Sequence, residues 1–181
     1  MPIVRNKKIE VLFSAEQLAR RNHELAEEIA LSNLSNILVI SILKGSFVFA
    51  ADLIRSLHAV GLAPEVEFIS VSSYGGGTQS SQVRLLRDVE TDVAGRDILL
   101  IDDILESGNT LKFTRDLMQS RGAKRVAVVA LLDKSMKRRT EITADYVGFQ
   151  CPDKFVVGYG MDVGHAFREL PFVGVVTGDA G

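Results

Sequence analysis

The sequence predicts an α/β fold in which a mostly parallel central sheet is flanked by helices, formed by a single domain over residues 1–181. Runs of consecutive apolar residues, typical of strands buried on both faces, recur along the chain. Segments with apolar residues at helical spacing alternate with these runs, and this alternation favours parallel strands joined by right-handed crossovers. A length of 181 residues suits one domain with one core.

The first expected elements are a strand and a capped helix. The run Ile9–Phe13 predicts a short strand. Ser14 follows it, and Gln17 three residues later completes the capping-box pattern that begins a helix, which we expect to extend to about Leu31. Apolar residues at roughly helical spacing give this helix one buried face; they are Leu18, Leu25 and Ile29.

A second strand and helix follow. Asn36–Leu43 is expected to be a buried strand, and the tripeptide Lys44-Gly45-Ser46 leads from it into a helix. The apolar face of that helix consists of Phe47, Ala50, Leu53, Ile54 and Leu57. Gly61 and Pro64 end the unit and precede a third strand, Val66–Val71.

The remaining elements continue the alternation. A strand ends at Asp102, a helix covers Leu111–Arg121, and another strand covers Arg125–Leu132. The carboxyl-terminal third is less regular, and we expect short strands there at 146–149, 155–159 and 173–176. Residues 72–83 contain three consecutive glycines and no apolar periodicity, which predicts a mobile loop. Composition alone does not decide whether this loop is a lid or a structureless surface insertion, and favours the two equally.

Composition limits the class of ligand and the compartment. The net charge is −2, from 21 basic and 23 acidic residues, so no general electrostatic attraction to nucleic acid or an anionic membrane is indicated. Cys151 is the only cysteine, which excludes an intrachain disulfide and favours a reducing compartment. No apolar run approaches the ~20 residues needed to span a bilayer. We therefore expect a soluble, cytoplasmic protein.

The most informative segment is Ile98–Leu111, where a buried strand ends at two carboxylates and enters a loop with hydroxyls and a glycine. Open α/β sheets bind ligands at the carboxyl ends of their strands, where Asp102 and Asp103 are expected to lie. The loop Ser107–Thr110 supplies backbone N–H groups at a helix start, which favours a phosphate. Without that loop, an acidic pair after a strand is about as often part of a solvated turn or a helix cap as part of a binding site.

Other candidates are weaker when taken one by one. Glu106 is close enough to reach the same ligand, although an acidic residue near a helix start is also common. Lys44 lies where a cation and backbone amides can meet a second anion, but a lone lysine after a strand is usually solvated; the same holds for Lys134 and Arg168. The three histidines show no metal-ligand spacing, and neither a Walker A loop nor a dinucleotide fingerprint is present.

The acidic motif Ile101–Leu111 resembles the phosphoribosyl diphosphate signature of the type I phosphoribosyltransferases, in particular the hypoxanthine-guanine members of that family. Leu43–Ser46 is similar to the family's diphosphate loop, and Ser73-Tyr74 to the dipeptide of its catalytic lid. Asp153–Asp162 resembles its purine-binding segment, and Phe167–Pro171 its tail. The resemblance covers nearly the whole chain and implies the family fold, including a small irregular hood built from the terminal segments.

The resemblance also implies a role for each matching position. The acids Asp102 and Asp103 would meet the ribose hydroxyls and Mg²⁺, and the 5′-phosphate would be bound by Ser107, Gly108, Asn109 and Thr110. Diphosphate would be bound by Lys44, Gly45 and Arg168, after a cis peptide between Leu43 and Lys44. The purine would contact Lys134, Phe155 and Val156, while Asp162 would help to place a second Mg²⁺. Ser73 and Tyr74 would belong to the lid.

One position departs from the family. Most members carry an aspartate that deprotonates the purine at N7, whereas this chain has Glu106, which is one methylene longer. A glutamate side chain in water has a pKa of ~4.3, close to the ~3.9 of aspartate, so the chemistry is kept and the reach changes. A general base must lie about 2.6–3.2 Å from the proton donor. Our hypothesis is that Glu106 is the catalytic base.

The activity implied is transfer of a 5-phosphoribosyl group from its diphosphate to N9 of hypoxanthine or guanine, giving IMP or GMP and diphosphate. The family's members are dimers or tetramers, so a homodimer or homotetramer is expected. The alternative is a nucleotide-sensing, RNA-binding transcriptional regulator on the same fold, which would need a basic face. The longest basic cluster is Lys134–Arg139, and we interpret its Lys137-Arg138-Arg139 run as a solvated turn or subunit contact. The sequence does not separate hypoxanthine, guanine and xanthine as bases.

Overall fold

A computed structural model of the protein describes residues 1–74 and 82–179; for Ser73, Tyr74 and Gln82 it describes the backbone. Within these ranges the main sheet has six strands in the order β5-β4-β3-β6-β7-β8. The strands are β3 Ile37–Leu43, β4 Glu65–Tyr74, β5 Gln82–Arg87, β6 Asp97–Leu105, β7 Arg125–Asp133 and β8 Tyr146–Gln150. All neighbouring pairs are parallel except β4 and β5. The predicted α/β class with a mostly parallel sheet is confirmed.

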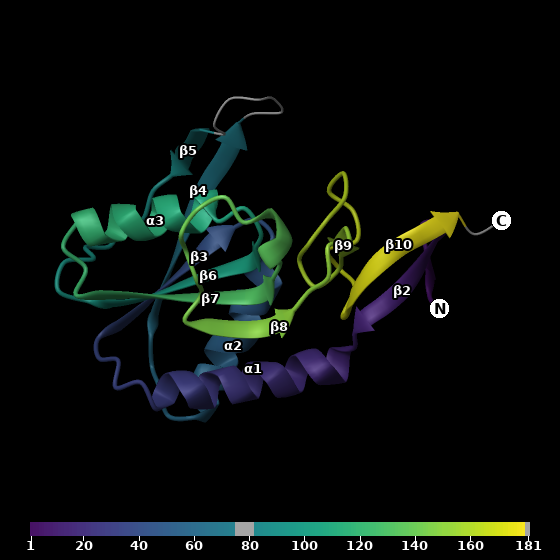
Figure 1. Cartoon of the computed structure of the whole chain (residues 1–181). Coiled ribbons are helices and arrows are strands. Elements are labelled where there is room, and N and C mark those ends of the chain that lie inside the picture. The colour runs from purple at the N-terminus through teal and green to yellow at the C-terminus, as the bar shows by residue number, and fades with distance from the viewer. Residues whose placement is uncertain (75–81, 180–181) are drawn as a thin grey trace.

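Helices cover both faces of this sheet. Helices α1 (Ala15–Ala30) and α2 (Phe47–Ala59) lie on one face and α3 (Asn109–Ser120) lies on the other (Figure 1). Successive residues of β6 point to opposite layers: Leu99 and Ile101 pack with α1 and α2, whereas Ile98 and Leu100 pack with α3. Because both faces of the central strands are buried, the strands consist of continuous apolar runs.

The predicted start of the first helix is confirmed in detail. The Gln17 backbone N–H donates to Ser14 Oγ over 3.3 Å, and the Ser14 N–H donates to Gln17 Oε1 over 2.8 Å, which is a capping box. The helix then ends at Ala30, one residue before the expected Leu31. No helix in the described part of the chain is long and apolar enough to cross a membrane.

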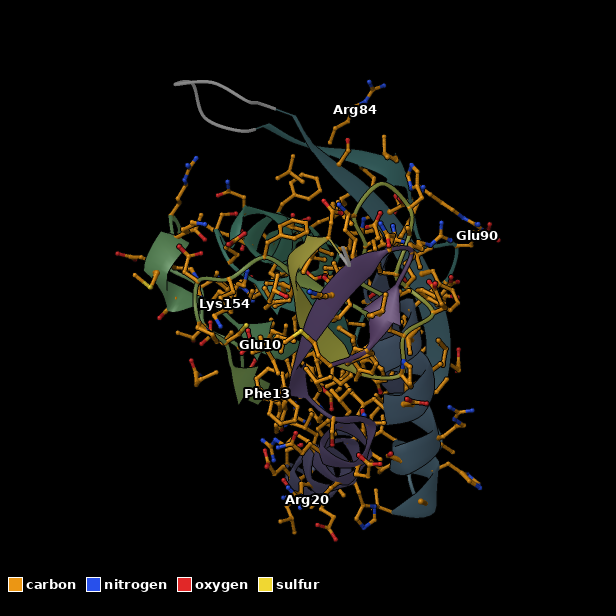
Figure 2. All side chains as sticks on the ribbon, turned by 90° about the vertical axis from the view of Figure 1, so that its right-hand side faces the viewer. Glu10, Phe13, Arg20, Arg84, Glu90 and Lys154 are labelled. Carbon is orange, nitrogen blue, oxygen red and sulfur yellow. The ribbon has the colours of Figure 1, made fainter. Side chains whose placement is uncertain are left out.

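A second, smaller sheet joins the two ends of the chain. Within the described residues its four strands run in the order β1-β2-β10-β9, and all pairs are antiparallel. The strands are β1 Ile3–Val4, β2 Lys7–Phe13, β9 Val156–Val157 and β10 Val173–Asp179. In Figure 2 this sheet faces the viewer, and Lys154 Nζ lies 3.6 Å from Glu10 Oε2, so an ion pair links the segment before β9 to β2. This sheet corresponds to the small hood of terminal segments that the family resemblance implies.

Two expectations about the elements near the candidate site are wrong. The strand that was expected to end at Asp102 continues to Leu105, because β6 keeps its pairing with β7 as far as Leu105 opposite Asp133. Part of the predicted loop 72–83 is also strand: β4 extends to Tyr74, and β5 pairs with it in antiparallel register. Residues 75–81 of that loop lie outside the described residues.

Asp97 anchors the opposite, amino-terminal end of β6. Its buried carboxylate accepts hydrogen bonds from Arg125 Nε at 2.9 Å and from the Ser35 backbone N–H at 2.7 Å. The Arg125 guanidinium holds the pKa of Asp97 at about 2, below its usual 3.8. Arg125 and Ser35 therefore bind a carboxylate that is charged throughout the physiological pH range.

This pKa shift predicts a specific pH dependence of stability. A carboxyl group with a lowered pKa in the folded state adds stability above its unfolded pKa and loses it as the pH falls through the folded pKa. We expect the urea midpoint to fall between about pH 5 and pH 2, and to fall less steeply in Asp97→Asn. Urea titrations across this range measure it. Asp116→Asn, on the exposed surface of α3, is the control, and identical acid slopes in Asp97→Asn and wild type would contradict the assignment.

Candidate active site

A polar cavity lies at the carboxyl ends of the adjacent strands β3 and β6. Its volume is about 280 Å³, and it is lined by the last residues of both strands and by the loops that follow them. The loop after β3 contains a cis peptide bond between Leu43 and Lys44. Ser46 fixes this loop to the strand it leaves, because its buried hydroxyl lies 2.7 Å from Ser41 Oγ and donates to Ile42 O over 2.5 Å.

The predicted acidic pair, Asp102 and Asp103, lines this cavity from β6. Burial raises the pKa of both carboxyls, and the charge of Asp103 raises that of Asp102 further. Each side chain accepts a bond from the next backbone N–H: Asp103 N–H donates to Asp102 Oδ1 at 3.0 Å and Ile104 N–H to Asp103 Oδ1 at 2.9 Å. Neither carboxylate has an ion pair within 4.0 Å in residues 1–74 and 82–179. Burial therefore disfavours the charged form of both carboxyls, and a cation in the cavity would favour it.

The two loops of the cavity touch through Gly45. A Cβ atom at Gly45 would lie 1.8 Å from Asp103 Oδ2, so the carboxylate occupies the space that any other residue would need. Gly160 approaches the same loop from the hood side, where a Cβ would lie 2.3 Å from the Gly45 carbonyl oxygen. Lys44 lies directly after the cis bond and before Gly45, and it is exposed. The structure therefore brings the predicted diphosphate loop against the acidic pair.

The predicted phosphate loop, Ser107–Thr110, closes the other side of the cavity. Gly108 is the N-cap of α3 and has φ +84°, a left-handed conformation that glycine adopts without steric cost. A Cβ there would also lie 2.3 Å from Thr140 Oγ1. The helix begins at Asn109, two residues earlier than expected, so Asn109 and Thr110 belong to its first turn, where the Asn109 N–H donates to Ser107 Oγ over 3.4 Å. This is a suitable site for an anion.

Arg138 holds the backbone of this loop and was not identified from the sequence. Its guanidinium donates to Glu106 O at 2.9 Å, Leu105 O at 3.2 Å and Ile142 O at 2.7 Å, and it pairs with Asp133. Binding these carbonyls fixes the path of the chain from β6 into the phosphate loop. The interpretation of this basic run as a solvated turn or subunit contact is therefore wrong for Arg138. Its sequence neighbours are also cations, so no spacing signal distinguishes it.

A second cavity, of about 310 Å³, adjoins the first and shares Asp103, Ile104 and Glu106 with it. Lys134 and Glu106 lie in this cavity, with 3.6 Å between Lys134 Nζ and Glu106 Oε1. The remaining wall carries the predicted purine contacts Phe155 and Val156, and it also includes Asp162. Lys134 is 7% exposed, whereas Phe155 is 64% exposed. An exposed ring, a buried ammonium and a carboxylate around one cavity suit a flat, polar heterocycle.

The predicted residues Asp162 and Arg168 are engaged with each other. Arg168 Nη2 lies 2.8 Å from Asp162 Oδ1, and Arg168 Nη1 donates to Gly160 O over 2.6 Å. No group of three or more metal-ligating side chains is found in the described residues, so Asp162 does not form one cluster with the acidic pair. Ser73 and Tyr74 lie at the end of β4, and their side chains are outside the description.

An α/β sheet with an acidic pair and an anion-binding helix start at its strand ends, joined to a heterocycle cavity, defines a protein that binds a sugar phosphate next to a base. The comparisons with known proteins give the family. Residues 9–163 match the phosphoribosyl transferase domain. Over 168 residues the chain is 44% identical to the hypoxanthine-guanine phosphoribosyltransferase of Bacillus subtilis, covering 92% of each protein.

Two further relatives extend this likeness. The hypoxanthine-guanine phosphoribosyltransferase of Aquifex aeolicus is 41% identical over 179 residues, covering 97% of this chain and 99% of that protein. The crystal structure of the enzyme from Bacillus anthracis, with a HEPES molecule in its active site, has a TM-score of 0.87 at 42% identity and covers 94% and 99% of the two chains. The chain belongs to the hypoxanthine-guanine phosphoribosyltransferase family.

Proposed function

We propose that the protein is a purine salvage enzyme that transfers the 5-phosphoribosyl group from 5-phosphoribosyl 1-diphosphate to N9 of hypoxanthine or guanine. The observation that carries the proposal is the contact of the two cavities at Asp103, Ile104 and Glu106. Such an arrangement places a sugar phosphate in one cavity and a flat base in the other, with the new bond formed where they meet. The products are IMP or GMP and diphosphate.

The donor is bound by the first cavity. The 5′-phosphate lies at the start of α3, where it is bound by Ser107, Gly108, Asn109 and Thr110. The ribose hydroxyls are bound by Asp102 and Asp103, and the diphosphate by Lys44, Gly45 and Arg168. The Arg168 guanidinium pairs with Asp162. To bind diphosphate, it must therefore be shared between Asp162 and the diphosphate. Ser73 and Tyr74 are the lid residues that exclude water from the activated donor.

Mg²⁺ suits the acidic pair. Two adjacent carboxylates in one cavity offer the oxygen ligands that a hard divalent cation prefers. Asp102 and Asp103 would hold it, directly or through water, and Asp162 would contribute to a second ion. Bound Mg²⁺ would neutralise charge on the donor's diphosphate. In the ground state the carboxylates also fix the position of the ribose, since both accept backbone hydrogen bonds that limit their rotation.

The base is bound and activated by the second cavity. Phe155 stacks on the purine ring, Lys134 donates to its 6-oxo group, and Val156 contacts the exocyclic edge through its backbone. Glu106 takes the proton from N7, which raises the electron density at N9 as the bond to the ribose forms. As the bond to the ribose breaks, diphosphate leaves with the bonding electrons and gains negative charge, so Lys44 and Arg168 stabilise the departing group.

The alternative of an RNA-binding regulator finds no support in the basic run. Arg138 is engaged with backbone carbonyls, and Lys137 lies within 4.0 Å of two acids. We also propose that the chain acts as one domain, in the cytoplasm, as a homodimer or homotetramer. Exposed apolar side chains on β4 and at the start of α2 support assembly; they are Phe47, Val66 and Phe68. Light scattering during gel filtration measures the mass.

The test is a transfer assay with each base in turn. We expect diphosphate release with hypoxanthine or guanine in the presence of donor and Mg²⁺, and loss of activity when EDTA removes the metal, restored by adding Mg²⁺ in excess. Xanthine in the same assay measures base preference. Nucleotide formation is followed by absorbance. A protein that binds RNA on a filter at moderate salt but releases no diphosphate with any of the three bases would overturn the proposal.

A further inference from the structure

The side chain of Glu106 lies between two lysines. Glu106 Oε1 is 3.6 Å from Lys134 Nζ and 3.8 Å from Lys137 Nζ. The two cations differ in position: the Lys134 side chain is 8% exposed and forms the inner wall of the base cavity, whereas the Lys137 side chain is 60% exposed at its outer edge. Glu106 therefore has one ammonium partner beside the base and a second on the solvent side.

The inner lysine is not available to Glu106 throughout the reaction. Under the function proposed above, Lys134 donates to the 6-oxo group of the bound base, so its N–H groups are shared between base and carboxylate. Lys137 remains outside the bound base. We propose that Lys137 is the positioning residue that holds the Glu106 carboxylate while Lys134 is hydrogen-bonded to the base. This inference rests on the proposed function and adds a residue to it.

Lys137 is itself held in place. Its ammonium lies 2.8 Å from Asp153 Oδ1, and Asp153 comes directly before the segment that carries Phe155 and Val156. The Asp153 carboxylate, and then that of Glu106, raise the pKa of Lys137. The 3-10 turn Ser135–Lys137 fixes its backbone between Lys134 and Arg138. Lys137 thus joins the general base to the segment that binds the ring.

The extra methylene of Glu106 explains why such a partner is needed. A glutamate side chain has one more rotatable bond than an aspartate, so ordering its carboxylate costs more conformational entropy. A second cation on the solvent side offsets this cost by favouring one orientation. An aspartate on the same backbone would extend less far from the loop and would depend less on Lys137. We therefore predict that activity depends on Lys137 only when the residue at position 106 is a glutamate.

The experiment compares Lys137→Met with Lys137→Arg. We expect Lys137→Met to lower kcat about two- to fivefold, the loss that removal of a partly exposed ion pair produces, and Lys137→Arg to restore most of it. The KM of the donor stays unchanged, because Lys137 is outside the donor cavity. Arg139→Met is the matched control: it removes an exposed cation two positions away whose side chain has no ion pair among the described residues.

A second background separates positioning from a structural role. In Glu106→Asp we expect Lys137→Met to have no further effect on kcat, so the two substitutions are non-additive. Equal kcat losses from Lys137→Met in the two backgrounds, or a loss of thermal stability with unchanged kcat, would overturn the inference. If Glu106→Asp is too slow to assay, the comparison of Lys137→Arg with Lys137→Met tests the positioning role instead. A wild-type protein inactive with all three bases refutes the proposed function instead.

Discussion

Glu106→Gln is expected to lower kcat by roughly 10²- to 10⁴-fold, the contribution of a positioned general base. The amide has nearly the same shape as the carboxylate, so it keeps the position beside Lys134 but cannot accept the proton from the purine. The donor cavity keeps its acidic pair and its anion site, so binding of the donor should change little. Steady-state kinetics with hypoxanthine and guanine, combined with calorimetric titration of the base, separate turnover from binding.

The controls for this substitution come from the same region of the chain. Glu141→Gln removes one exposed carboxylate that forms no ion pair in the described residues, and it should leave kcat unchanged. Glu106→Asp keeps the carboxylate on a shorter side chain and should keep measurable activity. If Glu106→Gln retains near wild-type turnover with unchanged base binding, another group accepts the proton.

Gly45→Ala is expected to lower kcat/KM for the donor by about 10²-fold, the cost of misplacing a catalytic group by around 1 Å. The new Cβ would lie 1.8 Å from Asp103 Oδ2 and 2.6 Å from Asp103 Cγ, so either the loop or the carboxylate must move. Both lie in the donor cavity, and the affected step is binding and orientation of the ribose diphosphate. Kinetics at varied donor concentration measure the loss.

Gly178→Ala is the matched control for this substitution, because a Cβ at that position in β10 meets no atom within 4 Å. Its kinetics and thermal midpoint should equal those of the wild type. Gly45 does not have a positive φ, so alanine fits its backbone and the effect arises from contact alone. A Gly45→Ala protein with unchanged kcat/KM for the donor would show that Asp103 moves aside without cost.

Much of the fold could be predicted from local pattern. The capping box at Ser14 and the apolar runs of β3, β6 and β7 depend on neighbouring residues, so the sequence predicts them well. The end of β6 depends instead on pairing with β7, and the strand β5 depends on its partner β4. Such pairings are decided by residues distant in sequence, and local pattern alone places Asp102 at a strand end when it lies within one.

The candidate site divides in the same way. The acidic pair, Gly45 and the phosphate loop are close in sequence to the strand ends that position them, and the structure brings them around one cavity. The contacts of Arg138 with three backbone carbonyls could not be predicted, because one cation in a basic run is not distinguished by type or spacing. Its role depends on where the carbonyls of a distant loop point.

The pairing of the two chain ends in the small sheet has a consequence for the order in which the parts of the protein are completed during synthesis. Residues 37–134 contain all of the donor cavity, whereas Val156 and Val157 pair with β10, which in turn pairs with β2. The strand β2 is made before β10 and gains this partner only after Val173–Asp179 have been made. Because contacts between distant segments form late, we expect the lining of the first cavity to be complete before the small sheet that carries Val156, and Arg168 to join it only with that sheet.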